Sequence, residues 1–244
     1  MNDLKVALEL YTVRDETARD FAGTLRHVAR IGYPGVEFAG YGNLTAQEMS
    51  ALLKETGLNP VATHLRLDAL QGAQLEASIR YCLDIGCFNI VLPWLANEWR
   101  SPDGMQKLAP QLNAIGQRCQ EHGISFGYHN HDFEFSRVDD SYLFDYLLQA
   151  TDPKLVRLEP DVYWVAYAGI DPVEFLRTHA GRIALIHFKD MAADRSMTEV
   201  GKGMLDMRSM WEFAQAHDLW AIVENDHPQI PAIESARISL EYFR

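Results

Sequence analysis

The segment Met105–His129, with the sequence MQKLAPQLNAIGQRCQEHGISFGYH, contains the unit from which the fold of this chain is built. Its first part, Met105–Glu121, repeats apolar residues at the spacing of an amphipathic helix, and a short apolar run, Ser125–His129, follows it. Gly123 lies between the two, where a helix commonly ends on a left-handed residue. The segment therefore predicts a helix that ends near a glycine and leads directly into a strand.

This alternation occurs eight times along the chain. The strand candidates are Val6–Tyr11, Gly35–Ala39, Pro60–Leu65, Asn89–Pro93, Ser125–His129, Val156–Glu159, Ile183–Phe188 and Ala221–Asn225. The helix candidates are Ala22–Ile31, Ala46–Thr56, Leu75–Ile85, Met105–Glu121, Tyr142–Leu148, Pro172–His179, Met207–His217 and Ile233–Phe243. Strands that alternate with helices in this way imply a parallel sheet, and eight units complete an α/β fold of the (β/α)8 TIM barrel type. A doubly wound open sheet usually needs only five or six strands and leaves the last units without a place.

Residues at the expected element ends support this interpretation. Gly32, Gly57 and Gly86 each follow a helix candidate closely, as glycines that end helices do. Thr45 and Asp171 stand where side chains commonly cap helix amino termini, and Asp171 is followed by a proline. We expect a single barrel domain over residues 1–244.

Composition and charge restrict the function classes. The 244 residues are 48% hydrophobic and 23% charged, which is typical of a globular domain. With 22 basic and 34 acidic residues, the net charge of -12 repels nucleic acids and anionic membrane surfaces. We therefore expect no nucleic-acid partner and no membrane partner.

The cysteines and the amino terminus bear on location. Three cysteines, Cys82, Cys87 and Cys119, lie in or beside helix candidates without metal-ligand spacing, and we expect them to be reduced core thiols. Met1–Lys5 has neither the basic nor the apolar region of an export signal. These features favour a cytoplasmic protein.

Polar residues concentrate at the expected strand ends, where the active sites of TIM barrels are built. Five of the nine histidines lie at or just past strand candidates, namely His64, His129, His131, His187 and His227. Carboxylates follow the same pattern, with Glu134 after the fifth strand, Asp161 at the sixth and Glu224 at the eighth. Together with His187 on the seventh strand they supply three oxygen ligands and one nitrogen ligand. This set suits a divalent cation such as Mn²⁺, Mg²⁺, Co²⁺ or Zn²⁺.

Strand alternation extends the polar region, because residues two apart share one face. Lys189 then shares a face with His187, Arg66 with His64, and Tyr11 with Glu9. Glu159 and Arg157 also share a face, and we expect them to form an internal ion pair. Trp94, Trp99 and Trp164 near strand ends suit either the core or an apolar wall against a sugar ring.

Six motifs together carry a resemblance to a known family that runs through essentially the whole chain. They are LYTVRD at 10–15, IGYPGVEFAGY at 31–41, YHNHDFEF at 128–135, EPDVYWV at 159–165, IHFKD at 186–190 and VEND at 223–226. In these motifs the sequence resembles the sugar phosphate isomerase/epimerase family, which has a xylose-isomerase-like TIM barrel. The resemblance implies a divalent metal held by Glu134, Asp161, His187 and Glu224.

The resemblance also implies substrate contacts. Many relatives carry the first glutamate inside strand five, whereas here Glu134 comes later, so His129 or His131 is the alternative as ligand or substrate contact. The turn 200–203 resembles the glycine-containing substrate loop of the family and contains Lys202. The expected substrate-binding residues are His64, Arg66, His129, His131, Trp164, Lys189 and Lys202.

The expected activity is that of a metal-dependent isomerase or epimerase. It would act on a keto-sugar, keto-polyol or related carbohydrate through an ene-diolate, with Glu134 and Glu224 as the acid/base pair. A metal-dependent dehydratase or lyase acting on a keto-sugar or cyclitol needs the same enolisation and is the first alternative. A non-catalytic sugar-binding protein and an endonuclease are weaker alternatives. A homodimer or homotetramer is the expected assembly.

Overall fold

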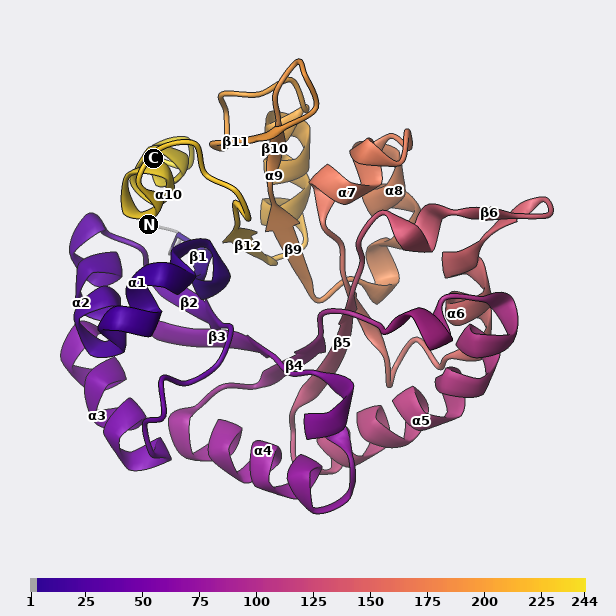
Figure 1. Cartoon of the computed structure of the whole chain (residues 1–244), viewed down its shortest axis with the longest axis horizontal. Helices are drawn as coiled ribbons and strands as arrows, with labels where there is room; N and C mark the ends of the chain where they lie inside the picture. Colours follow the sequence, from indigo (N-terminus) through magenta and orange to yellow (C-terminus); the bar gives the residue numbers. More distant parts are fainter. Residues whose placement is uncertain (1–3) are drawn as a thin grey trace.

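The chain forms a ring of eight parallel strands surrounded by helices, in a computed structural model that describes residues 4–244 (Figure 1). Residues 1–3, which belong to the amino-terminal segment discussed above, lie outside the described residues. The strands are β1 (Val6–Glu9), β2 (Gly35–Phe38), β3 (Asn59–His64), β4 (Asn89–Leu92), β5 (Ser125–His129), β8 (Arg157–Glu159), β9 (Leu185–Phe188) and β12 (Trp220–Val223).

The strand order confirms the predicted barrel. Neighbours follow the order β8-β5-β4-β3-β2-β1-β12-β9, and every pair in this order is parallel. Two isolated parallel bridges, Leu158 to Ile183 and Asp161 to His187, connect β8 with β9 at the ends of the order. The sheet is therefore a nearly closed barrel rather than an open, doubly wound sheet.

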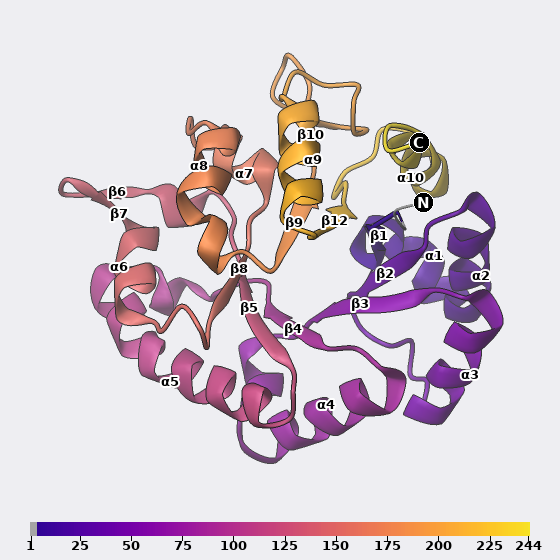
Figure 2. The same cartoon turned by 180° about the vertical axis from the view of Figure 1, so that it is seen from behind.

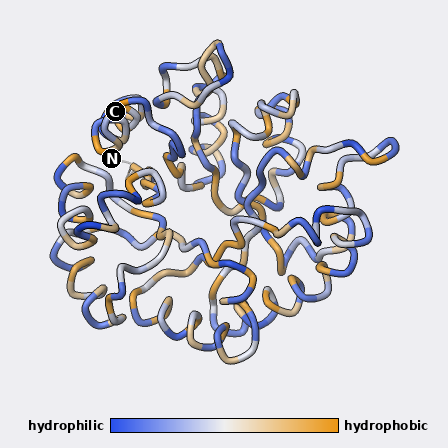
Figure 3. The backbone as a smooth tube through the Cα atoms, viewed as in Figure 1, coloured by the Kyte–Doolittle hydropathy of each residue, from blue (hydrophilic) through white to orange (hydrophobic). Residues whose placement is uncertain are grey.

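The helices lie outside the ring of strands in both views (Figures 1 and 2). They are α1 (Arg14–Arg19), α2 (Phe21–Ile31), α3 (Ala46–Thr56), α4 (Gly72–Ile85), α5 (Pro102–Glu121), α6 (Leu143–Ala150), α7 (Val162–Tyr167), α8 (Pro172–His179), α9 (Met207–Ala216) and α10 (Ala232–Glu241). Two small antiparallel hairpins, β6–β7 (Arg137–Val138 and Ser141–Tyr142) and β10–β11 (Asp190–Met191 and Met197–Thr198), extend from the loops. Hydrophobic and hydrophilic stretches alternate along the outer helices, as expected for helices with one face on the sheet (Figure 3).

The predicted helix ends are confirmed. Gly32 and Gly57 end α2 and α3 with φ angles of 102° and 72°, which a residue with a side chain adopts only with strain. Thr45 caps α3 in a reciprocal capping box with Glu48, and the Asp171 carboxylate caps α8. Several element boundaries differ from the prediction by a few residues. For example, α5 begins at Pro102 instead of Met105, and β1 stops at Glu9 instead of Tyr11, because a 3-10 turn over Leu10–Val13 begins there.

The side chains inside the barrel change from apolar to polar toward the carboxyl ends of the strands. A buried apolar cluster contains Ala7 of β1, Leu185 of β9 and Ile222 of β12. Two residues further along the chain stand Glu9 at the end of β1, His187 in β9 and Glu224 just after β12. The carboxyl end of the barrel thus holds buried polar groups over an apolar base.

The three cysteines are buried and none of them forms a disulfide, which confirms their prediction as core thiols. Within residues 4–244, no helix is both long enough and apolar enough to cross a membrane.

Candidate functional site

Four buried side chains meet at the carboxyl end of the barrel, and we refer to them as the ligand cluster: His129, Asp161, His187 and Glu224. One potential ligand atom from each lies within 4.8 Å of those of the other three. His129 and His187 belong to β5 and β9, while Asp161 and Glu224 come just after β8 and β12. Four consecutive strands of the second half of the barrel therefore contribute one group each.

Both histidines of the ligand cluster are held by buried carboxylates. His187 Nε2 lies 2.6 Å from Glu37 Oε2, which leaves Nδ1 facing Glu224 at 2.9 Å. His129 Nδ1 lies 3.2 Å from Glu159, while its Nε2 faces Asp161 at 3.9 Å. A metal-binding histidine typically uses one ring nitrogen as ligand and donates the other N–H to a carboxylate. His129 and His187 have this kind of arrangement, because each has one ring nitrogen on a carboxylate and the other facing a further member of the ligand cluster.

In contact with the ligand cluster lies a second group, the acid–histidine layer, made of Glu9, Glu37, His64 and Glu159. Glu159 is its centre, with one carboxylate oxygen 2.7 Å from His64 Nε2 and 3.2 Å from His187 Nε2. Burial opposes ionisation of Glu159, but the charges of His187 and His64 hold its pKa well below the usual value. Burial and the nearby Glu37 and Glu224 instead raise the pKa of Glu9 well above its usual value. The layer therefore contains one carboxyl group, Glu159, whose surroundings favour the ionised form and another, Glu9, whose surroundings favour the protonated form.

Arg157 does not form the expected ion pair with Glu159, so that prediction is wrong. Its guanidinium donates hydrogen bonds to the carbonyl groups of Gly181 and Ile183, at 3.1 and 2.9 Å. Glu159 instead contacts the histidines of three other strands.

Lys189 supplies a positive charge to this acidic region. Its Nζ atom lies 2.9 Å from Asp161 Oδ2, 2.9 Å from Glu224 Oε2 and 3.0 Å from Asp226 Oδ2. Burial alone would lower the pKa of Lys189, but Asp161 and Glu224 raise it well above its usual value. The ammonium group therefore holds two members of the ligand cluster in place.

Glu134 lies outside the ligand cluster. It belongs to the 3-10 turn Phe133–Phe135, where the Tyr128 hydroxyl donates to its Oε1 at 2.6 Å and the His131 backbone N–H donates to its Oε2 at 2.8 Å. Burial raises the pKa of Glu134 to about 7. The structure brings Asp161, His187 and Glu224 together as expected, but places His129 from strand five beside them instead of Glu134.

A cavity of about 700 Å³ gives access to the site. Five of the expected substrate-binding residues line it, namely His64, Arg66, His129, His131 and Trp164, as does Glu224. Burial lowers the pKa of His131 to about 3, and its ring lies 5.6 Å from that of Trp164. This cavity therefore joins the ligand cluster to an aromatic wall.

Lys189 and Lys202 differ from the other expected substrate contacts, because neither lines this cavity. Lys189 is 1% exposed and bonded to carboxylates, whereas Lys202 is exposed on the loop after β11. That loop is held by Asp190, whose Oδ2 accepts hydrogen bonds from the backbone of Gly201 and Gly203.

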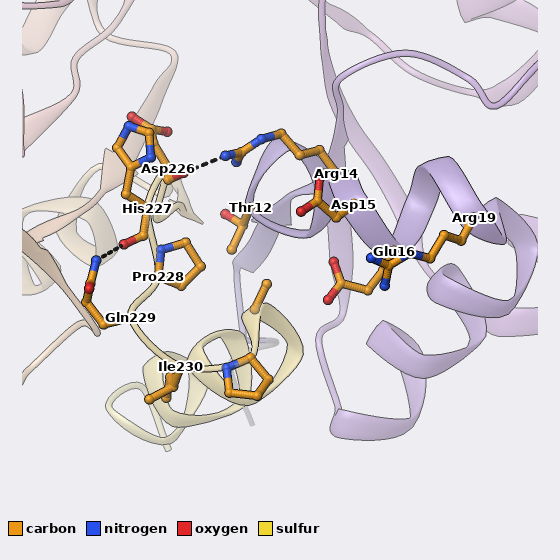
Figure 4. A pocket seen from close by; sticks show the side chains of 12 residues that line it. Thr12, Arg14, Asp15, Glu16, Arg19, Asp226, His227, Pro228, Gln229 and Ile230 are labelled. Carbon is orange, nitrogen blue, oxygen red and sulfur yellow. Dashed lines mark hydrogen bonds between the residues drawn. The ribbon is translucent and has the colours of Figure 1, made fainter.

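A second cavity of about 460 Å³ adjoins the first, and Asp226 and His227 line both (Figure 4). Arg14 crosses between its walls and donates a 2.9 Å hydrogen bond to the backbone carbonyl of Asp226. The loops after β1 and β12 are thereby connected.

Sequence reasoning missed Glu37 as a functional residue and gave no role to Asp226. Glu37 stands in the apolar strand β2, and a fully buried charge inside such a run is the signal that was available. Asp226 lies two residues after Glu224 in the loop that follows β12, so its closeness in sequence to a predicted ligand is the signal that was available.

Comparison with known proteins identifies the family of this chain. The sequence model of the xylose isomerase-like TIM barrel family matches residues 25–244. The chain belongs to this family. Among curated members of known sequence, inosose dehydratase of Lacticaseibacillus casei is 29% identical over 172 residues, which are 62% of this chain and 55% of that protein. Inosose dehydratase of Geobacillus kaustophilus is 26% identical over 207 residues, which are 76% of this chain and 66% of that protein. The chain spans a little over half to about two thirds of the length of these relatives.

Solved structures of other proteins share the fold. A sugar phosphate isomerase/epimerase from Parabacteroides distasonis superposes with a TM-score of 0.83 at 23% identity, covering 99% of this chain and 94% of the other. The 3-keto-D-glucoside 4-epimerase of E. coli has a TM-score of 0.75 at 20% identity, with 99% of both chains covered. The xylose-isomerase-like TIM barrel that the sequence resembles is thus confirmed as the family and the fold of this chain.

Proposed function

We propose that this chain is a divalent-metal-dependent enzyme that enolises a keto-sugar, keto-polyol or related carbohydrate and so isomerises or epimerises it. The observation that carries the proposal is the orientation of His129 and His187. Each has one ring nitrogen on a buried carboxylate and the other facing Asp161 or Glu224. A divalent ion held by the ligand cluster would stabilise the negative charge that develops on a carbonyl oxygen when the neighbouring C–H is deprotonated.

Glu224 is the residue we assign to proton abstraction. It lines the cavity, and although burial opposes its ionisation, Lys189 and His187 hold its pKa well below the usual value. Its carboxylate is therefore ready to accept a proton from a sugar carbon in the cavity.

His131 is the second residue we assign to proton transfer. It comes from the loop after β5, several strands away from Glu224, and its Nδ1 has no hydrogen-bond partner among the described residues. Glu134 is not assigned this role because its carboxyl group already accepts hydrogen bonds from Tyr128 and from the His131 backbone. In this assignment Glu134 positions the loop that carries His131.

A dehydratase acting on a keto-sugar or cyclitol is the second candidate, and the inosose dehydratase relatives favour it. Both reactions begin with removal of a proton next to a carbonyl group. They differ in the next step, in which a proton returns to carbon or a hydroxyl group leaves.

The test is to incubate the Mn²⁺-loaded protein in D₂O with a panel of ketoses and inososes. We expect NMR to show deuterium at a carbon next to the carbonyl, and Glu224→Gln to abolish it. Epimers or isomers whose mass differs from that of the substrate only by the deuterium taken up support the first candidate, whereas loss of water seen by mass spectrometry supports the second. If no sugar exchanges a proton and none changes its structure with Mn²⁺, Mg²⁺, Co²⁺ or Zn²⁺, the proposal fails.

A further inference from the structure

The cavity is much wider than the ligand cluster requires. The ligand cluster belongs to β5, β8, β9 and β12, which form one half of the barrel. The cavity continues over the other half, where residues following β1, β2, β3 and β4 line it. A volume of about 700 Å³ lies within the range of pockets that enclose ligands of drug size, which exceed one sugar ring. A single ring placed at the ligand cluster therefore leaves the half over β1–β4 unfilled.

Two exposed aromatic side chains border this unfilled half. Trp94 follows β4 and is 40% exposed, and Tyr11 follows β1 and is 45% exposed. Both line the same cavity as His129 and Glu224. Ligand-binding pockets are lined predominantly by hydrophobic and aromatic side chains, and these two rings line this one.

Arginine side chains keep both rings in place. The Arg14 guanidinium lies 4.5 Å from the centre of the Tyr11 ring and is itself bonded to the carbonyls of Tyr11 and Asp226. The Arg100 guanidinium lies 4.9 Å from the centre of the Trp94 ring and donates to the Leu95 carbonyl. Rings fixed in this way lose little conformational freedom when a ligand binds.

Charged groups beside Trp94 complete a surface suited to a sugar. Arg66 and Asp68 line the cavity, 4.0 Å apart, with side chains that are 77% and 83% exposed. A pyranose ring presents C–H groups on its faces, which pack on an aromatic ring, and hydroxyl groups at its edge, which bond to charged side chains. Trp94, Arg66 and Asp68 offer both kinds of contact.

We infer that Trp94, with Arg66 and Asp68, forms an outer subsite for a second sugar ring, so that the substrate is a keto-glycoside of at least two rings. The inner ring lies at the ligand cluster and the outer ring lies on Trp94. This inference deepens the proposed function and rests on it for the chemistry at the inner ring.

The inner and outer rings can be tested separately by binding, without turnover. Isothermal titration and saturation-transfer NMR on the Mg²⁺-loaded protein would compare trehalose, maltose, cellobiose and sucrose with glucose, fructose and the methyl and phenyl glucosides. We expect at least one disaccharide to bind about tenfold more tightly than its component sugars, the size of effect that one ring stacked on an aromatic side chain supplies.

Variants assign this advantage to the outer subsite. We expect Trp94→Ala to remove the tighter binding of the disaccharide without changing monosaccharide binding, and Trp94→Phe to retain most of that tighter binding. Phe88→Ala, which removes a 53% exposed aromatic ring outside the cavity, is the matched control and should have no effect. Thermal unfolding confirms that each variant is folded.

Three results would overturn the inference. Disaccharides could bind no better than monosaccharides, Trp94→Ala could weaken both equally, or phenyl glucosides alone could depend on Trp94, which would indicate an aromatic aglycone. Failure of the proposed function would give a different set of results. No sugar would exchange protons in D₂O, but disaccharides would still bind more tightly than monosaccharides.

Discussion

Asp161 and His187 face each other in an isolated parallel bridge between β8 and β9, the two strands at which the barrel closes. The His187 backbone N–H donates to the carbonyl of Pro160 at 2.9 Å across the same seam. Two members of the ligand cluster are therefore brought together by the bridges that close the sheet. Assembly of the site depends on closure of the barrel, and an ion bound there would connect the two strands at the seam.

The first prediction is that divalent ions stabilise the protein and that the ligand cluster binds them. An ion that binds only the folded state raises the free energy of unfolding by RT ln(1 + [L]/Kd), so the melting temperature should rise with Mn²⁺ concentration. We expect about one ion per chain, measured by metal analysis and calorimetry. His187→Ala and Asp161→Ala should lose most of the thermal shift.

His227→Ala is the control for this experiment, because His227 is exposed and lies outside the ligand cluster. Its thermal shift should match that of the unmodified protein. A full shift in His187→Ala would show that the ion binds elsewhere.

The second prediction decides which residue near strand five is the ligand. His129→Gln should weaken Mn²⁺ binding strongly, because His129 faces Asp161 and lies in the ligand cluster. Glu134→Gln should keep the ion, because the Glu134 carboxyl group bonds to Tyr128 and His131 instead. Titration calorimetry of the two variants gives the ranking, and the opposite order would restore Glu134 as the ligand.

Much of this arrangement was predictable from the sequence, and the exceptions have physical causes. Periodicity predicted the strands, and because parallel strands end at one edge, it also brought Asp161, His187 and Glu224 together. The place of Glu134 depends on a 3-10 turn after β5, and residue spacing does not determine the direction of a side chain in such a turn. Arg157 and Glu159 do share a parity, but hydrogen bonds to the carbonyls of Gly181 and Ile183 take up the Arg157 guanidinium. Such contacts between distant segments become visible only in three dimensions.

The third prediction concerns the carboxylate that orients His187. Glu37→Gln should weaken Mn²⁺ binding by about 10- to 100-fold, the usual effect of losing a carboxylate partner of a metal-binding histidine. Glu9→Gln is the matched control, because Glu9 is as buried as Glu37. Burial and the nearby Glu37 raise the pKa of Glu9 well above its usual value, so a neutral amide resembles the form that Glu9 favours. Equal losses in both variants would indicate a general effect on the acid–histidine layer.

The fourth prediction is a pH dependence of stability that comes from Glu134. Burial raises its pKa to about 7 from an ordinary 4.5, so the folded state binds this proton more tightly than the unfolded state. The free energy of unfolding should therefore fall as the pH rises from about 4.5 to about 7, by at most about 3 kcal/mol, and then level off.

Glu134→Gln should remove this fall. A glutamine can accept from the His131 backbone and donate to the Tyr128 hydroxyl, so both hydrogen bonds survive without a titrating group. Urea unfolding from pH 4.5 to 8 should show that the free energy of unfolding of the variant increases relative to that of the unmodified protein as the pH rises. The exposed Glu98→Gln serves as control, and parallel curves for all three proteins would contradict the prediction.

The last prediction concerns Lys189, whose Nζ lies within 3.0 Å of Asp161, Glu224 and Asp226. Lys189→Met preserves much of the side-chain volume but leaves these carboxylates without their ammonium partner, and breaking a buried ion pair costs about 3–5 kcal/mol. A divalent ion in the ligand cluster would supply the missing positive charge to Asp161 and Glu224. Without metal, the variant should therefore melt at a much lower temperature than the unmodified protein. Mn²⁺ should then raise the melting temperature of the variant by more than it raises that of the unmodified protein. Lys5→Met, which removes an exposed lysine paired with Asp218, should show neither effect. Mn²⁺ could instead stabilise Lys189→Met less than it stabilises the unmodified protein. That result would contradict the prediction, because it would mean that Lys189 orients Asp161 and Glu224 for metal binding and does not replace the charge of the ion.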